Sequence, residues 1–366
     1  MSTKKVLVIG GATMDTLIEY ENMETMVHKS TRGQQSYLLL EEGDKIEVTN
    51  QSYASGGGGT NTAVSFKRQG FEVTLVCKIG EDVLGKIIID ELKSHKVSTK
   101  HITTSVRRGT ASSFVVPSLK GDRTVFTYRG ANTTLLSKEL PLAQIQNHDF
   151  VYITSLSQES SKRLPEIAKI AKEHKKMVAI NPGVSQLKHG SLAIKAALPD
   201  ISMLILNLDE AKQLMLSLVS DDKRLQAMLK TPTAEAMSLY DKPLNIQHIY
   251  FSLRHFFTTV IKLGPAIVVV TDGAEGVYVA TPEKLYYHPA LKENVVNTLG
   301  AGDAFGSGFV GAYVNTQSID VAIQMGVANS ASVIAYPDAK TGLLTGDALA
   351  KKAATIQNDL LQTFLW

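Results

Sequence analysis

Short runs of apolar, mostly β-branched residues recur along the chain, and stretches with helical periodicity separate them. The runs are continuous rather than alternating, which is typical of strands that are buried on both faces of a sheet. Such strands joined by helices form a mostly parallel sheet. The sequence therefore predicts a three-layer α/β/α sandwich. The expected strands are Val6–Ile9, Val73–Ile79, Phe150–Ile153, Met177–Ile180, Met203–Leu206 and Ile267–Thr271, and the expected helices are Asn61–Gln69, Val83–His95, Ser160–His174, Ala211–Leu218 and Ala304–Val314.

Three segments interrupt this rhythm. Residues of about 16–55 and 106–130 have strand-like patterns with turns, which indicates a small separate sheet. Such a sheet can close over a site as a lid that excludes water, and it can also serve as a contact between two copies of the chain. Residues of about 217–260 are mixed and polar, and we expect them to form a peripheral helical insertion.

Composition argues against several classes of protein. The net charge of +3 is small for 366 residues, and no basic run could follow a nucleic-acid backbone. No apolar stretch approaches the roughly 20 residues of a membrane span, and the first one is too short for a signal peptide. The single Cys77 has no disulfide partner, which fits a reducing compartment. We expect a cytoplasmic protein that binds neither nucleic acid nor membrane.

Small residues precede one expected helix, where Gly300, Ala301 and Gly302 are followed by Asp303. Exposed backbone N–H groups at a helix start can close around an anion when side chains are small. A carboxylate would repel a passively bound phosphate, but it suits a group that receives a proton while a phosphoryl group is transferred. The segment therefore indicates a kinase, and the alternative is an ordinary turn that the acid caps.

Two further motifs suit an alcohol acceptor. The run Gly56–Gly59 lets the backbone approach a ligand closely, and Asn61 offers a donor and an acceptor to hydroxyl groups. Asp15 follows the first strand at the carboxyl edge, where doubly wound sheets bind ligands. A hinge capped by Asn61 and a turn at Asp15 are the structural alternatives. The glycines after the first strand do not complete a dinucleotide-binding fingerprint.

Two turns suit a nucleotide. Asn207 and Glu210 follow an expected strand and open a helix, where they can hold a hydrated magnesium ion beside phosphates. A capping pair is the structural alternative. Thr271, Gly273 and Gly276 form a glycine turn that can pass under a nucleotide or simply close a hairpin.

These motifs, in this order, resemble the ribokinase-like, or PfkB, family of carbohydrate kinases. The similarity runs from Gly10 to about Gly342, and we expect a single ribokinase-like domain over 1–366 with a small β-sheet lid. The resemblance implies ATP and Mg²⁺ as cofactors. By position it implies that Asp303 is the catalytic base, that Gly300, Ala301 and Gly302 form the anion hole, that Asp15, Gly57, Gly58 and Asn61 hold the acceptor, that Asn207, Thr271, Gly273, Gly276, Thr298 and Asn329 contact the nucleotide, and that Glu210 organises magnesium through water.

Two positions depart from the family's usual pattern. The family usually has an acid that helps to hold a monovalent cation where this chain has Asn297, which places potassium activation in doubt. Ribokinase-type sequences often have a lysine where this chain has Gly58, so ribose is not the favoured acceptor.

The second lid segment ends in a Tyr-Arg step, Tyr128-Arg129. In fructokinases and in kinases of ketodeoxy sugar acids, a similar step lets the arginine reach the acceptor. A guanidinium suits a carboxylate, a phosphate or several sugar oxygens, and the alternative is a surface arginine on a lid strand. We expect an ATP-dependent kinase that phosphorylates an alcohol group of a small sugar or sugar acid. A nucleoside kinase of the same family and a non-catalytic sensing relative are the alternatives.

Overall fold

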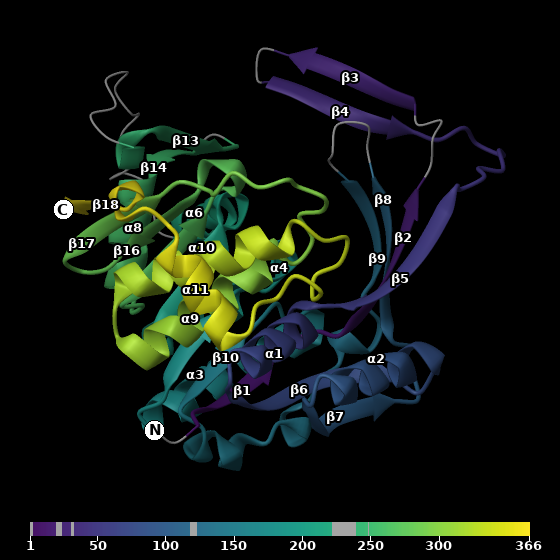
Figure 1. Cartoon of the computed structure of the whole chain (residues 1–366), viewed down its shortest axis with the longest axis horizontal. Coiled ribbons are helices and arrows are strands. Elements are labelled where there is room, and N and C mark those ends of the chain that lie inside the picture. The colour runs from purple at the N-terminus through teal and green to yellow at the C-terminus, as the bar shows by residue number, and fades with distance from the viewer. Residues whose placement is uncertain (1–2, 20–23, 31–32, 118–122, 222–238, 248) are drawn as a thin grey trace.

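A ten-stranded sheet lies at the centre of the computed structural model (Figure 1), which describes residues 3–19, 24–30, 33–117, 123–221, 239–247 and 249–366. Neighbouring strands are parallel from the β7 edge as far as β15 and antiparallel beyond it. In spatial order the strands are β18 (Gln362–Leu365), β17 (Lys284–His288), β16 (Val277–Ala280), β15 (Ile267–Thr271), β12 (Met203–Asn207), β11 (Met177–Ile180), β10 (Phe150–Ile153), β1 (Lys5–Ile9), β6 (Glu72–Gly80) and β7 (Ser98–Ser105).

Strand β1 shows why the apolar runs are continuous. Val6 and Val8 pack into the core on one face of the sheet, and Leu7 and Ile9 pack into the core on the other. Successive side chains of a strand point to opposite faces, so a sheet with helices on both faces needs apolar residues at every position. The predicted three-layer sandwich is confirmed.

Helices cover both faces of the sheet (Figure 1). The helix expected over Ser160–His174 begins later, because Pro165 lies in its first turn and the preceding residues Gln158–Arg163 form a 3₁₀ helix. One layer contains α1 (Gly58–Arg68), α2 (Val83–Ser94), α9 (Ala301–Thr316), α10 (Ile319–Val333) and α11 (Gly346–Ala354), and the other contains α3 (Leu164–Glu173), α4 (Val184–His189), α5 (Ser191–Ala197), α6 (Leu208–Asp221) and α8 (Leu253–Lys262).

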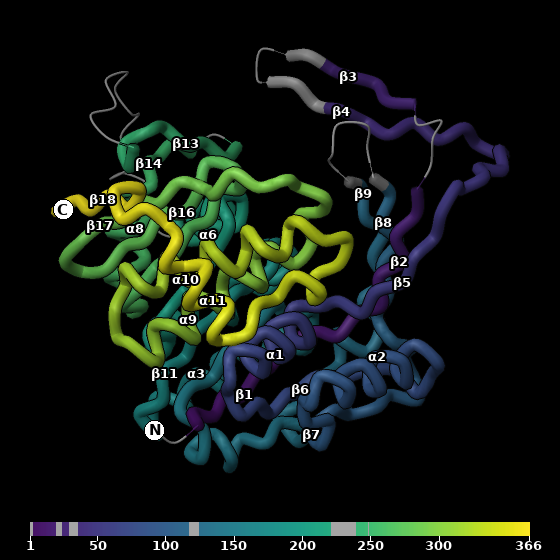
Figure 2. Tube along the Cα trace, viewed as in Figure 1, coloured from purple at the N-terminus to yellow at the C-terminus, as the bar shows by residue number. Residues whose placement is uncertain are grey.

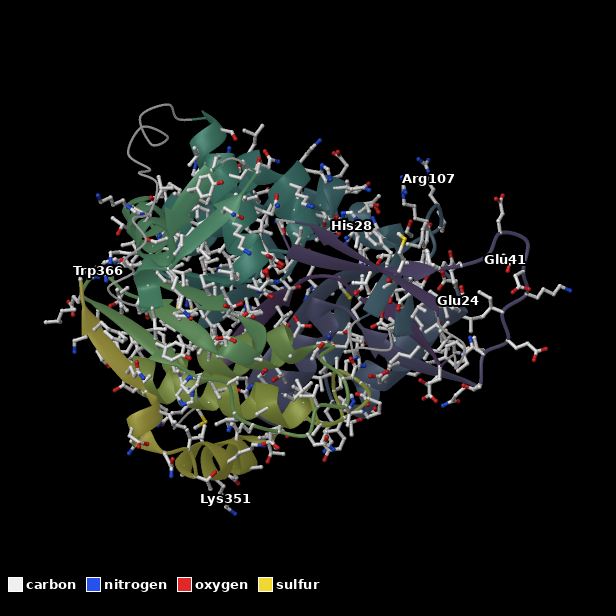
Figure 3. All side chains as sticks on the ribbon, turned by 90° about the horizontal axis from the view of Figure 1, so that it is seen from above. Glu24, His28, Glu41, Arg107, Lys351 and Trp366 are labelled. Carbon is white, nitrogen blue, oxygen red and sulfur yellow. The ribbon has the colours of Figure 1, made fainter. Side chains whose placement is uncertain are left out.

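A second, four-stranded sheet projects from one end of the sandwich, and we call it the lid (Figure 1). Its strands in spatial order are β5 (Asn50–Gly56), β2 (Thr13–Glu19), β8 (Ala111–Pro117) and β9 (Arg123–Tyr128). The hairpin of β3 (Glu24–Ser30) and β4 (Gly33–Leu39) extends from it. Both ends of the trace lie away from the lid (Figure 2), and Figure 3 shows Trp366 at the end of the molecule opposite Glu41.

The structure corrects the helical insertion expected over 217–260. The hairpin of β13 (Pro243–Ile246) and β14 (Ile249–Ser252) lies within it, and α8 belongs to the sandwich, since Phe256 and Phe257 are fully buried. Proline and alternating residues favour a short hairpin over a helix at this point. Residues 222–238 lie outside the described part of the chain.

Candidate functional site

Several of the expected site residues follow the carboxyl ends of parallel strands. Asn207 ends β12 and lies directly opposite Thr271, which ends β15. The loop after β1 leads into β2 of the lid, where Asp15 lies. Carboxyl ends of parallel strands meet at one edge of a sheet, which is where such folds bind ligands.

Asp303 lies in the first turn of α9. Gly300 and Gly302, which precede it, are glycine for different structural reasons. Gly300 caps the helix with φ +77°, and a Cβ there would lie 2.3 Å from the Cβ of Ala339. A Cβ on Gly302 would meet nothing within 4 Å. Gly300 therefore shapes the turn, whereas Gly302 leaves open space at the N-terminus of a 16-residue helix, which attracts anions.

The start of α1 lies against Asp303. Asn61 Nδ2 donates a hydrogen bond to Asp303 Oδ2 at 2.8 Å, and a Cβ on Gly58 would lie 3.1 Å from Asp303 Oδ1. Burial raises the pKa of Asp303, and the hydrogen bond from Asn61 and the charge of Lys340 lower it. Within the described chain, the buried Oδ1 of Asn61 has no hydrogen-bond partner. A polar ligand would satisfy that oxygen.

Gly57 lets α1 begin close to the loop after β1. It caps the helix with φ +92°, and a Cβ there would lie 2.6 Å from the Gly11 carbonyl oxygen. The Gly59 amide donates to the same oxygen at 3.0 Å. The glycine run therefore packs backbone against backbone at Gly57 and Gly59, whereas the sequence predicts a close approach to a ligand.

Asp15 is buried where the lid joins the sandwich. Its Oδ1 accepts a hydrogen bond from Ser113 Oγ, which lies opposite it in the β2–β8 ladder. Burial raises the pKa of Asp15, which is 6% exposed, while Ser113 and Lys340 lower it. We call this junction, Thr13–Asp15 with Ser55 and Gly56, the lid root.

Asn207 and Glu210 cap the start of α6 reciprocally. Asn207 N donates to Glu210 Oε2 at 2.9 Å, and Glu210 N donates to Asn207 Oδ1 at 2.8 Å. The pKa of Glu210 is raised to about 7, mainly by burial and also by the charges of Asp303 and Asp209, while the hydrogen bond from the Asn207 amide opposes the shift. The capping pair named above as the structural alternative is thus present, and it fixes the Glu210 carboxylate at the start of α6.

The turn after β15 is a hairpin. Thr271 Oγ1 donates to the Leu206 carbonyl at 3.5 Å, across to the neighbouring strand. Gly273 faces open space, whereas a Cβ on Gly276 would lie 2.2 Å from the His288 carbonyl oxygen. Gly273 is therefore the glycine of this turn that leaves room beside the sheet edge.

Asn329 lies in the interior instead of at a nucleotide pocket. Its Nδ2 donates to Ser65 Oγ at 3.2 Å and to the Ala304 carbonyl at 2.8 Å, and its Oδ1 accepts from Leu344 N at 3.1 Å. The side chain is fully buried and ties α10 to α1 and α9. A role in helix packing therefore replaces the expected nucleotide contact. Thr298, in contrast, is exposed just before Gly300.

Two residues at the margins of the site bear on the cation and the acceptor. Asn297 Nδ2 donates to the Pro337 carbonyl at 2.8 Å, and its Oδ1 accepts from Leu299 N at 2.9 Å. Arg129 is exposed, and its Nη1 donates to Ser157 Oγ at 3.2 Å. The guanidinium therefore reaches the segment that follows β10.

Sequence reasoning missed three residues near the site. Thr154 follows β10 directly, a position that could have signalled it, and its buried Oγ1 has no hydrogen-bond partner among the described residues. Ser113 is placed by strand pairing, and Lys340 lies in a loop without a motif. Only the folded chain brings the last two to the carboxylates.

Comparison with known proteins agrees with this arrangement. The model of the pfkB family carbohydrate kinases matches residues 5–237 and 253–345. The ribokinase of Staphylococcus aureus is 24% identical over 86% of this chain and 86% of its own length, and the 2-dehydro-3-deoxygluconokinase of Bacillus subtilis is 24% identical over 86% and 91%. The structure of Arabidopsis thaliana ribokinase complexed with ribose and ATP superposes with a TM-score of 0.74 at 19% identity, over 97% of this chain and all of that one.

The family match spans both the sandwich and the lid, and it leaves out 238–252, which contains the β13–β14 hairpin. Within the described residues, no helix has the length and apolarity needed to cross a bilayer. The chain belongs to the pfkB family of carbohydrate kinases, which are ATP-dependent phosphotransferases.

Proposed function

We propose that this kinase transfers the terminal phosphoryl group of ATP to an alcohol group of a small sugar or sugar acid, with Asp303 as the base. One observation carries the assignment: Asp303 is held by Asn61 at the open N-terminus of α9. There a carboxylate and an anion-binding backbone lie side by side.

The chemistry balances with these groups alone. The acceptor oxygen forms a bond to the terminal phosphorus of ATP, the bond from that phosphorus to the bridging oxygen breaks, and ADP leaves. The hydroxyl proton passes to the Asp303 carboxylate. The N–H groups at the start of α9 stabilise the negative charge on the transferring group. The Asp15 carboxylate and Asn61 Oδ1, which is unpartnered in the described part of the chain, accept hydrogen bonds that orient the acceptor.

The residues present suit a magnesium ion that keeps most of its waters. No three His, Cys, Asp or Glu side chains converge among the described residues, whereas Glu210 offers one buried carboxylate at the sheet edge. Magnesium binds through few protein oxygens together with substrate phosphates. When bound, it neutralises charge on the phosphates, and Glu210 and Asn207 would hold it through water.

A sugar acid or a ketose is the favoured acceptor. Gly58 supplies no side chain beside Asp303, and the Arg129 guanidinium can reach a carboxylate or several sugar oxygens above β10. A relative named for 2-dehydro-3-deoxygluconate supports this choice. The fully buried free thiol of Cys77 supports a reducing compartment such as the cytoplasm.

The acceptor is tested by ADP release over neutral sugars, sugar acids, sugar phosphates and nucleosides, with Mg²⁺-ATP and with or without potassium. We expect fructose or 2-dehydro-3-deoxygluconate to give the highest kcat/KM. Adenosine as the best acceptor would establish a nucleoside kinase instead. No ADP release with any acceptor would support a sensing protein that binds without catalysis.

The role of Asp303 is tested by Asp303→Asn. An amide oxygen still accepts from Asn61 but takes no proton, so kcat should fall by about 10²–10⁴-fold. ATP binding, measured by calorimetry, should stay nearly intact. Turnover close to that of the wild type would refute the assignment.

We also infer a homodimer formed through the lid. Tyr53, Thr16, Phe114 and Phe126 are paired in succession across the four lid strands, so they lie on one face, opposite to Asp15. We call them the aromatic row, and its aromatic members are 67%, 42% and 56% exposed in that order. A clustered apolar surface of this kind marks an interaction site, and a second copy offers the same surface.

A further inference from the structure

Lys340 is a buried lysine in the segment between α10 and α11. It is 4% exposed, and its ammonium group donates to the Ser55 carbonyl oxygen and to Ser55 Oγ and pairs with Glu91 Oε1 at 3.2 Å. Burying an ammonium group is costly unless acceptors surround it. All three of its donors are matched here, so Lys340 holds specific groups together.

The partners of Lys340 lead to the acceptor side of the site. Ser55 lies opposite Met14 in the β2–β5 ladder, next in sequence to the partner of Asp15. Gly56 follows Ser55 in sequence and packs tightly against the Asp15 carboxylate, since a Cβ on Gly56 would lie 2.0 Å from Asp15 Oδ2. Fixing Ser55 therefore fixes the strand that packs against the Asp15 carboxylate.

The same segment reaches the phosphate side of the site. Ala339 packs against Gly300, and the Pro337 carbonyl accepts the hydrogen bond from Asn297. Asp338 Oδ1 accepts from Lys340 N at 2.8 Å, which fixes the turn between these contacts. Four consecutive residues, 337–340, thus touch both the loop before α9 and the lid root.

The positive charge of Lys340 also acts on two carboxylates. It lowers the pKa of both Asp15 and Asp303, whereas burial raises both and Asp15 further raises the pKa of Asp303. The other charged or titratable groups around the ammonium are Glu91 on α2, His95 just after α2, Arg68 at the end of α1 and Asp338.

We propose that Lys340 is a positioning residue for phosphoryl transfer, which holds the lid root in register with the loop before α9 and acts as the shared counter-charge of Asp15 and Asp303. This inference rests on the proposed function, in which both carboxylates act ionised. A lysine that only pinned α2 to the lid would stabilise the fold without affecting the ionisation of either acid.

The test compares Lys340→Met with Lys78→Met. Lys78 in β6 is a second buried lysine, 7% exposed, and its Nζ forms an ion pair with Glu139 Oε1 at 2.7 Å. We measure kcat/KM against pH with fructose or 2-dehydro-3-deoxygluconate, whichever turns over faster, and KM for Mg²⁺-ATP. Without the counter-charge the two acids protonate at higher pH, so the acid limb of Lys340→Met should move upward by half a pH unit or more. KM for the sugar should rise about tenfold and KM for ATP less than twofold.

A second readout needs no acceptor. Amide hydrogen exchange of β5 should quicken in Lys340→Met and stay at the wild-type rate in Lys78→Met. If Lys340→Met does not fold, Ser55→Ala keeps the ammonium and removes one of its acceptors. Exchange in β5 should then quicken while the acid limb stays in place. Lys340→Arg keeps the charge and should restore the acid limb.

The outcomes separate the two proposals. An unshifted acid limb and unchanged β5 exchange in a folded Lys340→Met variant overturn the role of Lys340, provided that Asp303→Asn is inactive. Unchanged β5 exchange in Ser55→Ala, where that variant stands in, overturns it as well. An active Asp303→Asn variant would instead overturn the kinase mechanism on which the inference rests.

Discussion

Gly300 and Gly302 are two residues apart, yet the structure gives them opposite requirements. Gly300→Ala places a side chain at positive φ and against Ala339, so we expect it to destabilise the protein by about 1–3 kcal/mol. Gly302→Ala adds a methyl group to open space, so the fold should tolerate it. Turnover should nevertheless fall by about 10²-fold, because the methyl group occupies the space of the transferring phosphate.

Thermal unfolding and kcat together check this pair. The expected pattern is a lower melting temperature for Gly300→Ala and a near-normal one with low turnover for Gly302→Ala. Equal activity of Gly302→Ala and wild type would show that the phosphate does not approach this backbone.

Glu210 should cost stability in the absence of ligand. Its folded pKa of about 7 lies above its ordinary value of 4.5, so the folded state holds the proton more tightly. The corresponding stability is present below pH 4.5 and is lost as the pH rises to about 7. Glu210→Gln should therefore stabilise the ligand-free protein at pH 8, by on the order of 2 kcal/mol.

The measurement is thermal unfolding at pH 5 and pH 8 with and without Mg²⁺-ATP. The wild type should gain more from Mg²⁺-ATP than Glu210→Gln, because the carboxylate then has a counter-ion. Asp209→Asn is the matched control, since the side chain of Asp209 is 80% exposed on the same helix. If Mg²⁺-ATP stabilised the Glu210→Gln and Asp209→Asn variants equally, Glu210 would have no role in binding magnesium.

At the scale of elements, a side chain of the loop before α9 ties this loop to the segment between α10 and α11. Asn297 donates to the Pro337 carbonyl, an oxygen that a bound cation would otherwise attract. We therefore expect equal turnover in sodium and potassium. Asn297→Asp replaces the donor by a carboxylate beside that carbonyl, and turnover should become dependent on potassium.

Asn297→Ala provides the control for this loop. It loses the same hydrogen bond without adding a charge, so it should lower turnover in both salts equally. Potassium stimulation of the wild type would contradict the structural reason given for the loop.

At the scale of the whole molecule, the aromatic row predicts a dimer. Light scattering after size exclusion should give twice the chain mass of 39.7 kDa, and Phe114→Lys with Phe126→Lys should give the monomer. Leu192→Lys changes a 76% exposed residue on α5 and should leave the mass unchanged. A monomeric wild type at tens of micromolar would exclude the interface.

Much of the fold could be predicted because the central strands carry their own signature. Val6 to Ile9 must be apolar on both faces, and the order of strands and helices follows from that pattern. The hairpin within 217–260 was not predicted because its strands are short. A helix was expected in this stretch, but only packing shows that α8 belongs to the sandwich. Short elements depend on tertiary packing more than on local pattern.

Candidate site residues could be predicted from the sequence only where residues close in sequence act together. Gly300 to Asp303 and Asn207 with Glu210 form local units. Asn329 was assigned to the nucleotide by position alone, and its partners on three other segments give it a different role. Lys340 was invisible for the same reason, because its partners lie 285 and 249 positions away in sequence.

The lid and the sandwich are built on separate hydrogen-bonded sheets among the described residues. Asp303 and the turn before α9 belong to the sandwich, whereas Asp15 and the strand β9 that leads to Arg129 belong to the lid. Substrate preference can therefore diverge by exchange of the lid strands while the transfer chemistry is inherited unchanged. A chimera that receives the lid strands of a relative should acquire that relative's preferred sugar, provided that the contacts at the junction are transplanted with them.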